Sequence, residues 1–171
     1  MVLTYRLKFG IIKQMITEAN EMTNYDKLNK ELSALVEGVP HKIANLANGS
    51  ALLWGALDNI NWAGFYLIED KKLVLAPFQG KPACIEIPIG KGVCGSAVAE
   101  NKTLVVPDVH AFPGHVACDG ASNSEIVIPL RSASGDIIGV LDIDSPIFDR
   151  FSEEDRTGLE EFARIITDSI T

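Results

Sequence analysis

The chain has 171 residues, of which 47% are hydrophobic and 22% charged, a composition typical of one globular domain and not of a disordered polypeptide. Its formal net charge of -8, without a stripe rich in Lys and Arg, argues against a nucleic acid as partner. The sequence contains neither an apolar run that could span a bilayer nor a signal-peptide pattern, so we expect no membrane association and a cytoplasmic location.

Two helices are predicted at the start of the globular part, over residues 25–37 and 41–57. In the first, Leu28 and Leu32 begin an apolar stripe at helical spacing, and a Gly-Val-Pro sequence follows it. The short connection between the two segments implies that the helices lie side by side.

The middle of the chain alternates between strand-like and turn-like segments. Strands are predicted at 61–69, 73–79, 84–87 and 103–106, with a short helix of small residues at 93–100. Residues 107–124 have no usable period and contain several Gly, Pro and Asn residues. Loops of this length in compact domains are usually functional or disordered.

The last third is predicted to form a hairpin and a helix. Strands at 125–130 and 137–144 are joined by a turn, and Ser152 begins a Ser-Glu-Glu-Asp capping signature ahead of an apolar stripe. This order of elements predicts an α+β fold, with an antiparallel sheet and helices packed mainly on one face. The opposite face would hold a ligand pocket under the long loop.

Three cysteines are an odd number, which indicates reactive thiols in a reducing compartment rather than structural disulfides. Cys118 lies among polar and glycine neighbours at the end of the long loop, and is either a nucleophile or a half-buried cysteine without a role. Cys94 begins the short helix, where backbone N–H groups favour a thiolate. Either Cys94 or Cys84 could form a disulfide with an oxidised Cys118, although Cys84 could equally be ordinary strand packing.

Acidic and aromatic residues mark one face of the sheet. Strand alternation puts Asp142 and Asp144 on the same face, and Glu125 on the preceding strand could join them. Two such carboxylates call for a cation, a ligand ammonium group or a shared proton, unless they form a solvated sheet edge. Trp62 and Tyr66 also share a face, and form either an apolar cage for a methyl group and an electron-poor sulfur or ordinary core.

Zinc and nucleotide phosphates are weaker alternatives. The cysteines are separated by ten and twenty-four residues and lack the close pairs of structural zinc sites. The sequence Gly90-Lys91-Gly92 lacks the remainder of a phosphate-binding fingerprint. We therefore expect no metal and no bound cofactor.

Several motifs, in order along the chain, resemble one family, the free methionine-(R)-sulfoxide reductases, which are built on a GAF domain. The motifs are Asn61-Trp62-Ala63-Gly64-Phe65-Tyr66, Pro77-Phe78-Gln79-Gly80, Gly90-Lys91-Gly92-Val93-Cys94-Gly95, Asp108-Val109-His110, Phe112-Pro113-Gly114-His115, Ala117-Cys118-Asp119, Ser124-Glu125-Ile126-Val127 and Gly139-Val140-Leu141-Asp142-Ile143-Asp144-Ser145. The resemblance covers about Asn61 to the final helix, and the helices before Asn61 carry no recognised signature. We predict a single GAF domain over 21–171, preceded by an extension of unknown role at 1–20.

The resemblance also implies a mechanism, in which Cys118 attacks the sulfoxide sulfur and keeps a sulfenic acid when methionine leaves. A disulfide then forms, mainly with Cys94 and with Cys84 able to take part. Thioredoxin, itself reduced with NADPH, would be the electron donor. The expected activity is an oxidoreductase that repairs oxidatively damaged free methionine.

The same resemblance assigns the substrate contacts. Trp62 and Tyr66 would contact the methyl end, whereas Glu125, Asp142 and Asp144 would bind the polar groups. Clustered carboxylates could also hold the proton that the sulfoxide oxygen needs in order to leave as water. The alternative function is a non-catalytic GAF module that senses a small ligand. The sequence leaves open whether the chain forms a homodimer through its amino-terminal helices.

Overall fold

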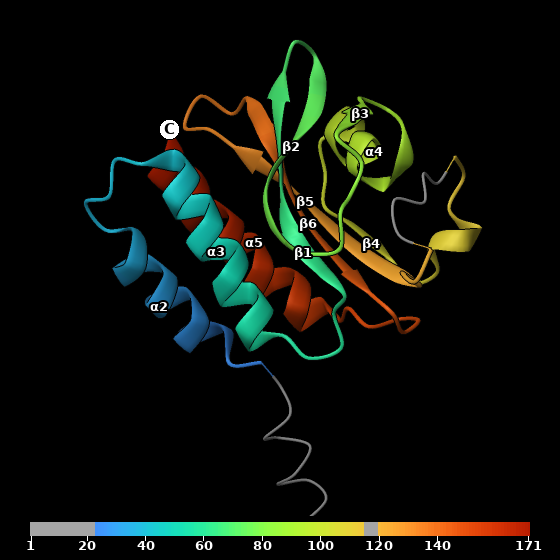
Figure 1. Cartoon of the computed structure of the whole chain (residues 1–171), viewed down its shortest axis with the longest axis horizontal. Helices are drawn as coiled ribbons and strands as arrows, with labels where there is room; N and C mark the ends of the chain where they lie inside the picture. Colours follow the sequence, from blue (N-terminus) through green and yellow to red (C-terminus); the bar gives the residue numbers. More distant parts are fainter. Residues whose placement is uncertain (1–22, 115–119) are drawn as a thin grey trace, which may run out of the picture.

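The computed structural model describes residues 23–114 and 120–171, which contain four α-helices, one 3-10 helix and six strands (Figure 1). In chain order these are α2 (Tyr25–Val36), α3 (Lys42–Ala56), β1 (Trp62–Glu69), β2 (Lys72–Gly80), β3 (Glu86–Pro88), α4 (Gly92–Glu100), β4 (Leu104–Val106), η1 (Val109–Ala111), β5 (Ser124–Arg131), β6 (Ile137–Ser145) and α5 (Glu153–Ile170). Within this part of the chain, no helix is long and apolar enough to cross a membrane.

All six strands form one antiparallel sheet in the order β3-β2-β1-β6-β5-β4. The hairpins β1–β2 and β5–β6 join at the centre through the pairing of β1 with β6, which brings the middle and last thirds of the chain together. The predicted α+β class and antiparallel sheet are therefore confirmed. The largest difference in strand bounds is at β3, which spans Glu86–Pro88 rather than the predicted 84–87.

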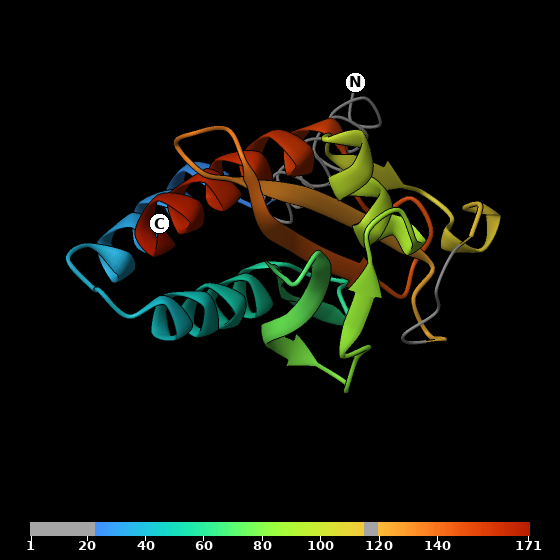
Figure 2. The ribbon, with the colours of Figure 1, turned by 90° about the horizontal axis from the view of Figure 1, so that it is seen from above.

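Helices α3 and α5 pack on one face of the sheet and α2 packs on these two helices, so that all three lie together on one side in Figures 1 and 2. The inward residues of β1 and β6 on this face include Phe65, Leu141 and Ile143, all fully buried. They pack with the apolar stripes of α2, α3 and α5 in one core. Helices therefore cover mainly this face, as the sequence predicted.

The alternate residues of the same strands face α4 and form a second, smaller core. It contains Trp62, Tyr66 and Val140 from the sheet and Val93 and Cys94 from α4. Because side chains alternate along a strand, Leu141 and Ile143 belong to one core while Asp142 lies on the face that carries α4. This face holds the residues that the sequence singled out.

The two ends of the segment predicted as a loop at 107–124 make defined contacts. It begins with η1, whose backbone N–H at His110 donates to Asp108 Oδ1 at 2.9 Å. At the other end, Asn61 Nδ2 donates to Ser122 Oγ at 3.0 Å, which ties the segment to the start of β1. Residues 115–119, which include Cys118, and residues 1–22 lie outside the described residues.

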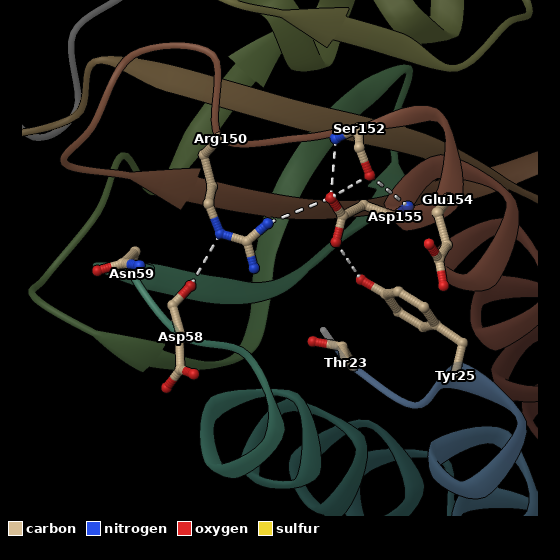
Figure 3. Close-up of a pocket in the computed structure, with 8 residues that line it drawn as sticks. All are labelled: Thr23, Tyr25, Asp58, Asn59, Arg150, Ser152, Glu154 and Asp155. Atoms are coloured by element: carbon tan, nitrogen blue, oxygen red, sulfur yellow. Dashed lines mark hydrogen bonds and ion pairs between the residues drawn. The ribbon is translucent and has the colours of Figure 1, made fainter. Parts of the chain in front are cut away.

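A buried polar network fastens α2 to the start of α5 (Figure 3). Ser152 caps α5, and its hydroxyl and backbone N–H both donate to Asp155 Oδ2, at 2.7 and 2.8 Å. Tyr25 donates its hydroxyl proton to Asp155 Oδ1 at 2.7 Å, and Arg150 forms an ion pair with the same carboxylate. Burial alone would raise the pKa of Asp155, but the donors from Tyr25, Ser152 and Arg150 outweigh it and lower the pKa.

Substitution Tyr25→Phe should lower the free energy of unfolding by about 1–3 kcal/mol, the usual contribution of a buried hydrogen bond to a charged group. Because the lowered pKa of Asp155 stabilises the fold above the ordinary aspartate pKa of about 4, the difference should be complete at neutral pH. It should shrink as the pH falls through the folded-state pKa. Urea unfolding at pH 7 and pH 3 measures both values, and an unchanged difference at pH 3 would contradict the assignment.

Candidate active site

The register of the central strands brings three acidic residues together on the α4 face. In the pairing of β5 with β6, Glu125 lies opposite Asp144, and Val127 lies opposite Asp142. Glu125 and Asp142 are buried, with 7% and 6% of their surface exposed, whereas Asp144 is only half-buried. The expected cluster therefore forms, but two of its members are far more enclosed than the third.

Helix α4 adds a thiol to this cluster. Cys94 lies in the first turn of α4, is 3% exposed, and its thiol donates to Glu125 Oε1 at 3.9 Å. Small residues allow α4 to approach the sheet: a Cβ at Gly95 would collide with the carbonyl oxygen of Pro88. The sequence placed Cys94 at a helix start, but gave no sign that its thiol meets two carboxylates.

Burial and like charge set the protonation of these groups. Burial, reinforced by the charges of Asp142 and Asp144, raises the pKa of Glu125 well above its usual range. Burial raises the pKa of Asp142 to about 6, against hydrogen bonds that lower it. Both shifts favour the protonated form, so the Glu125–Asp142 pair holds a proton more tightly than exposed carboxyl groups do.

The same surroundings affect Cys94. Burial is the largest cause that raises the pKa of its thiol well above the usual range, followed by the negative charges of Asp142 and Glu125. The expectation that the helix start favours a thiolate is therefore outweighed here, because desolvation and two carboxylates oppose ionisation. At neutral pH Cys94 is a neutral thiol in this structure.

Aromatic rings form one wall next to the carboxylates. The rings of Trp62 and Tyr66 stack with centroids 5.8 Å apart, and Phe78 also stacks with Trp62, at 5.2 Å. A Cβ at Gly64 would overlap Phe78, so the glycine is what lets the β1–β2 hairpin bring Phe78 against Trp62. Phe78 was not predicted as a site residue, although its place opposite Gly64 in the hairpin could have indicated it.

Hydrogen bonds anchor this wall to the segment before β3. Trp62 Nε1 donates to the carbonyl oxygen of Lys81 at 3.2 Å, and the Tyr66 hydroxyl donates to the carbonyl oxygen of Cys84 at 3.1 Å. Cys84 is half-buried and takes part in a disulfide, whereas Cys94 is a free thiol. The segment with Cys84 is thus held beside the aromatic side of the site.

The structure therefore brings together most of the residues predicted from the sequence. Two cysteines, two aromatic rings and three carboxylates surround one region of the α4 face, and they are Cys84, Cys94, Trp62, Tyr66, Glu125, Asp142 and Asp144. The predicted nucleophile, Cys118, lies outside the described residues, so its placement stays a prediction. A buried shared proton next to an aromatic wall suits an uncharged, polarisable group bearing an oxygen that must be protonated.

Comparison with known proteins agrees with this chemistry. The sequence pattern of the GAF domain matches residues 50–171. The free methionine-R-sulfoxide reductase of Escherichia coli (strain K12) is 57% identical over 142 residues, which are 83% of this chain and 86% of the relative. This chain belongs to the free methionine-R-sulfoxide reductase family, on a GAF domain. Because the GAF match begins at residue 50, the predicted domain boundary at residue 21 stays a prediction.

Solved structures of this family share the fold. The fRMsr of Staphylococcus aureus, in its reduced form and in complex with substrate, is 55% identical and superposes with TM-scores of 0.84 and 0.83. Both comparisons cover 88% of this chain and 97% of the other. The similarity therefore extends over nearly the whole described fold, including the α4 face.

Proposed function

We propose that this protein reduces free L-methionine-(R)-sulfoxide to L-methionine, with Cys118 as the nucleophile. The observation that carries the proposal is the burial of Glu125 and Asp142 together, next to the Trp62–Tyr66 wall, which raises the pKa of both carboxyl groups. Two relatives support the proposal. This chain is 57% identical to a free methionine-R-sulfoxide reductase, and its fold is similar to that of an fRMsr solved in complex with its substrate.

The two sides of the site suit the two ends of the substrate. The stacked rings of Trp62 and Tyr66 present a flat apolar surface for the S-methyl group. The carboxylates of Asp142 and Asp144 would bind the ammonium group of a free amino acid. A methionine inside a protein has an uncharged amide nitrogen at that position, and leaving a buried carboxylate unpaired is costly. Selectivity for the free amino acid follows.

The proposed reaction begins with the thiolate of Cys118. Its sulfur attacks the sulfoxide sulfur while the Glu125–Asp142 pair donates a proton to the sulfoxide oxygen. Methionine leaves, and Cys118 keeps the oxygen as a sulfenic acid, so that the substrate is reduced by two electrons and the cysteine is oxidised by two. A second thiol then attacks the sulfenic sulfur and releases water, which forms a disulfide. The dithiol of thioredoxin reduces that disulfide.

The second thiol was predicted to be mainly Cys94, and the described residues favour Cys84 instead. Cys84 is half-buried and already takes part in a disulfide. Cys94 is buried, free, and hydrogen-bonded to Glu125, and burial raises its pKa. Because a thiol attacks only as the thiolate, a buried thiol of raised pKa is a poor resolving group. We therefore assign resolution to Cys84 and keep Cys94 as the alternative.

Turnover of separated epimers tests the proposal. Reduced protein should consume the R epimer of free methionine sulfoxide, with thioredoxin or dithiothreitol as reductant, and leave the S epimer and a sulfoxide-containing peptide unchanged. Methionine released, quantified by chromatography, is the readout. No consumption of either epimer, combined with tight binding of the amino acid, would favour a ligand-binding GAF module. Equal consumption of both epimers would contradict the proposed stereochemistry.

A further inference from the structure

Cys94, Glu125 and Asp142 form a compact cluster of the atoms that bind metal ions. The Cys94 sulfur and one carboxylate oxygen from each acid lie within 4.8 Å of one another. The three residues come from three elements, α4, β5 and β6, and each is more than nine-tenths buried. Such a convergence needs the folded chain, because 31 residues separate Cys94 from Glu125.

One atom of the cluster shows that the site is incomplete without a ligand. Asp142 Oδ1 is buried and has no hydrogen-bond partner among the described residues. Leaving a buried polar atom unsatisfied costs about 1–3 kcal/mol, and more for a charged group, so such an atom in a native fold calls for an explanation. The charged groups that act on the three residues are all acidic as well, which favours a cation.

The donor set indicates which cation. A thiolate with two carboxylates suits a borderline-soft ion such as Zn²⁺, whereas Mg²⁺ and Ca²⁺ require oxygen ligands only. With Zn–S at about 2.3 Å and Zn–O at about 2.1 Å, tetrahedral ligand atoms lie roughly 3.4–3.6 Å apart. The observed 3.9 Å between Cys94 Sγ and Glu125 Oε1 is close to that separation, so small side-chain movements would close the site.

We propose that Cys94, Glu125 and Asp142 bind one Zn²⁺ ion when the site holds no substrate, with the fourth coordination position open. On binding, the Cys94 thiol releases its proton to solvent, as does the Glu125–Asp142 pair, and the ion gains one thiolate and two carboxylates. No electrons are transferred. Asp142 Oδ1 supplies one of the ligand atoms, and so gains the partner that it lacks.

Zn²⁺ bound to these three residues would inhibit the reduction of methionine sulfoxide. This consequence rests on the proposed function. The ion would occupy the carboxylates assigned to the proton and the ammonium group, so Zn²⁺ and free methionine sulfoxide should compete. Metal binding itself is measured without substrate. A protein that binds the ion yet reduces no sulfoxide would thus support this inference while contradicting the proposed function.

Because the chain has three cysteines, the double substitution Cys84→Ser with Cys118→Ser leaves Cys94 as the one thiol. Titration with Cd²⁺, a spectroscopic substitute for Zn²⁺, should produce a thiolate-to-cadmium ultraviolet band that saturates at one ion per chain. A chromophoric chelator then gives the Zn²⁺ affinity by competition. If the double variant does not fold, the reduced wild type and the single variant C94A can be titrated with Cd²⁺ instead. The difference between their two spectra should then show the same band.

Further substitutions in the double variant test whether Glu125 and Asp142 bind the ion together with Cys94, or whether the Cys94 thiol binds it alone. Cys94→Ala should abolish the band. Asp142→Asn and Glu125→Gln should each weaken binding by more than the roughly 10–100-fold that loss of an outer partner costs. Absence of the band, or unchanged affinity in both carboxylate variants, would overturn the proposal. Circular dichroism on each variant confirms that it is folded.

Discussion

Replacing Cys118 with serine should abolish reduction of free methionine-(R)-sulfoxide, with a loss in kcat on the order of 10⁴ or more. A serine hydroxyl is not ionised at neutral pH and cannot store the oxygen as a sulfenic acid, so both the attack and the intermediate are lost. Chromatographic assay of methionine, with dithiothreitol in excess, measures the effect. Retention of more than a few per cent of the wild-type rate would show that another group attacks the sulfur.

Binding and the other two cysteines supply the controls for that result. The Cys118→Ser variant retains the aromatic wall and the carboxylates, so calorimetry should show that it still binds the R epimer. Cys84→Ser should release about one methionine per chain and then stop with thioredoxin, because no disulfide forms. Cys94→Ser should continue to turn over with thioredoxin. The reverse behaviour of these two variants would assign resolution to Cys94.

Substitution Asp142→Asn should lower kcat/KM by roughly 10- to 150-fold, which corresponds to losing about 1.5–3 kcal/mol of hydrogen bonding to a charged group. The change removes a partner for the substrate ammonium group and one of the carboxyl groups that share the proton. Steady-state assays with the R epimer measure it. An unchanged kcat/KM would exclude Asp142 from the site.

The pH profile of this variant distinguishes a role in proton transfer from a structural one. The charge of Asp142 contributes to the raised pKa of Glu125, so its removal should lower that pKa, although burial still raises it. The decline in rate on the alkaline side should therefore begin at a lower pH than in the wild type. Thermal stability should not fall, because the substitution removes an ionisable group that is buried and has an oxygen, Oδ1, without a hydrogen-bond partner among the described residues. A less stable variant with an unshifted profile would indicate a structural role alone.

The local pattern of the sequence was sufficient for the elements and their faces. Alternation along β6 predicted that Asp142 and Asp144 would share one face, and in the structure the alternate residues Leu141 and Ile143 lie in the core on the opposite face. The Ser152 capping signature likewise predicted the start of α5. Period and capping are properties of neighbouring residues, so they can be read without knowing the fold.

Features that depend on packing between distant segments could not be predicted in this way. Asp142 and Asp144 looked equivalent, yet only Asp142 is buried, because α4 packs over the sheet where Cys94 meets Glu125. The Tyr25–Asp155 hydrogen bond joins residues 130 positions apart and left no local signal.

The sequence by itself determined the strand and helix pattern and the side chains available for chemistry. The tertiary structure decided which carboxyl groups are buried together, with raised pKa values, and which thiol is free. Burial and the approach of like charges set these properties, and both arise only when β5, β6 and α4 come together.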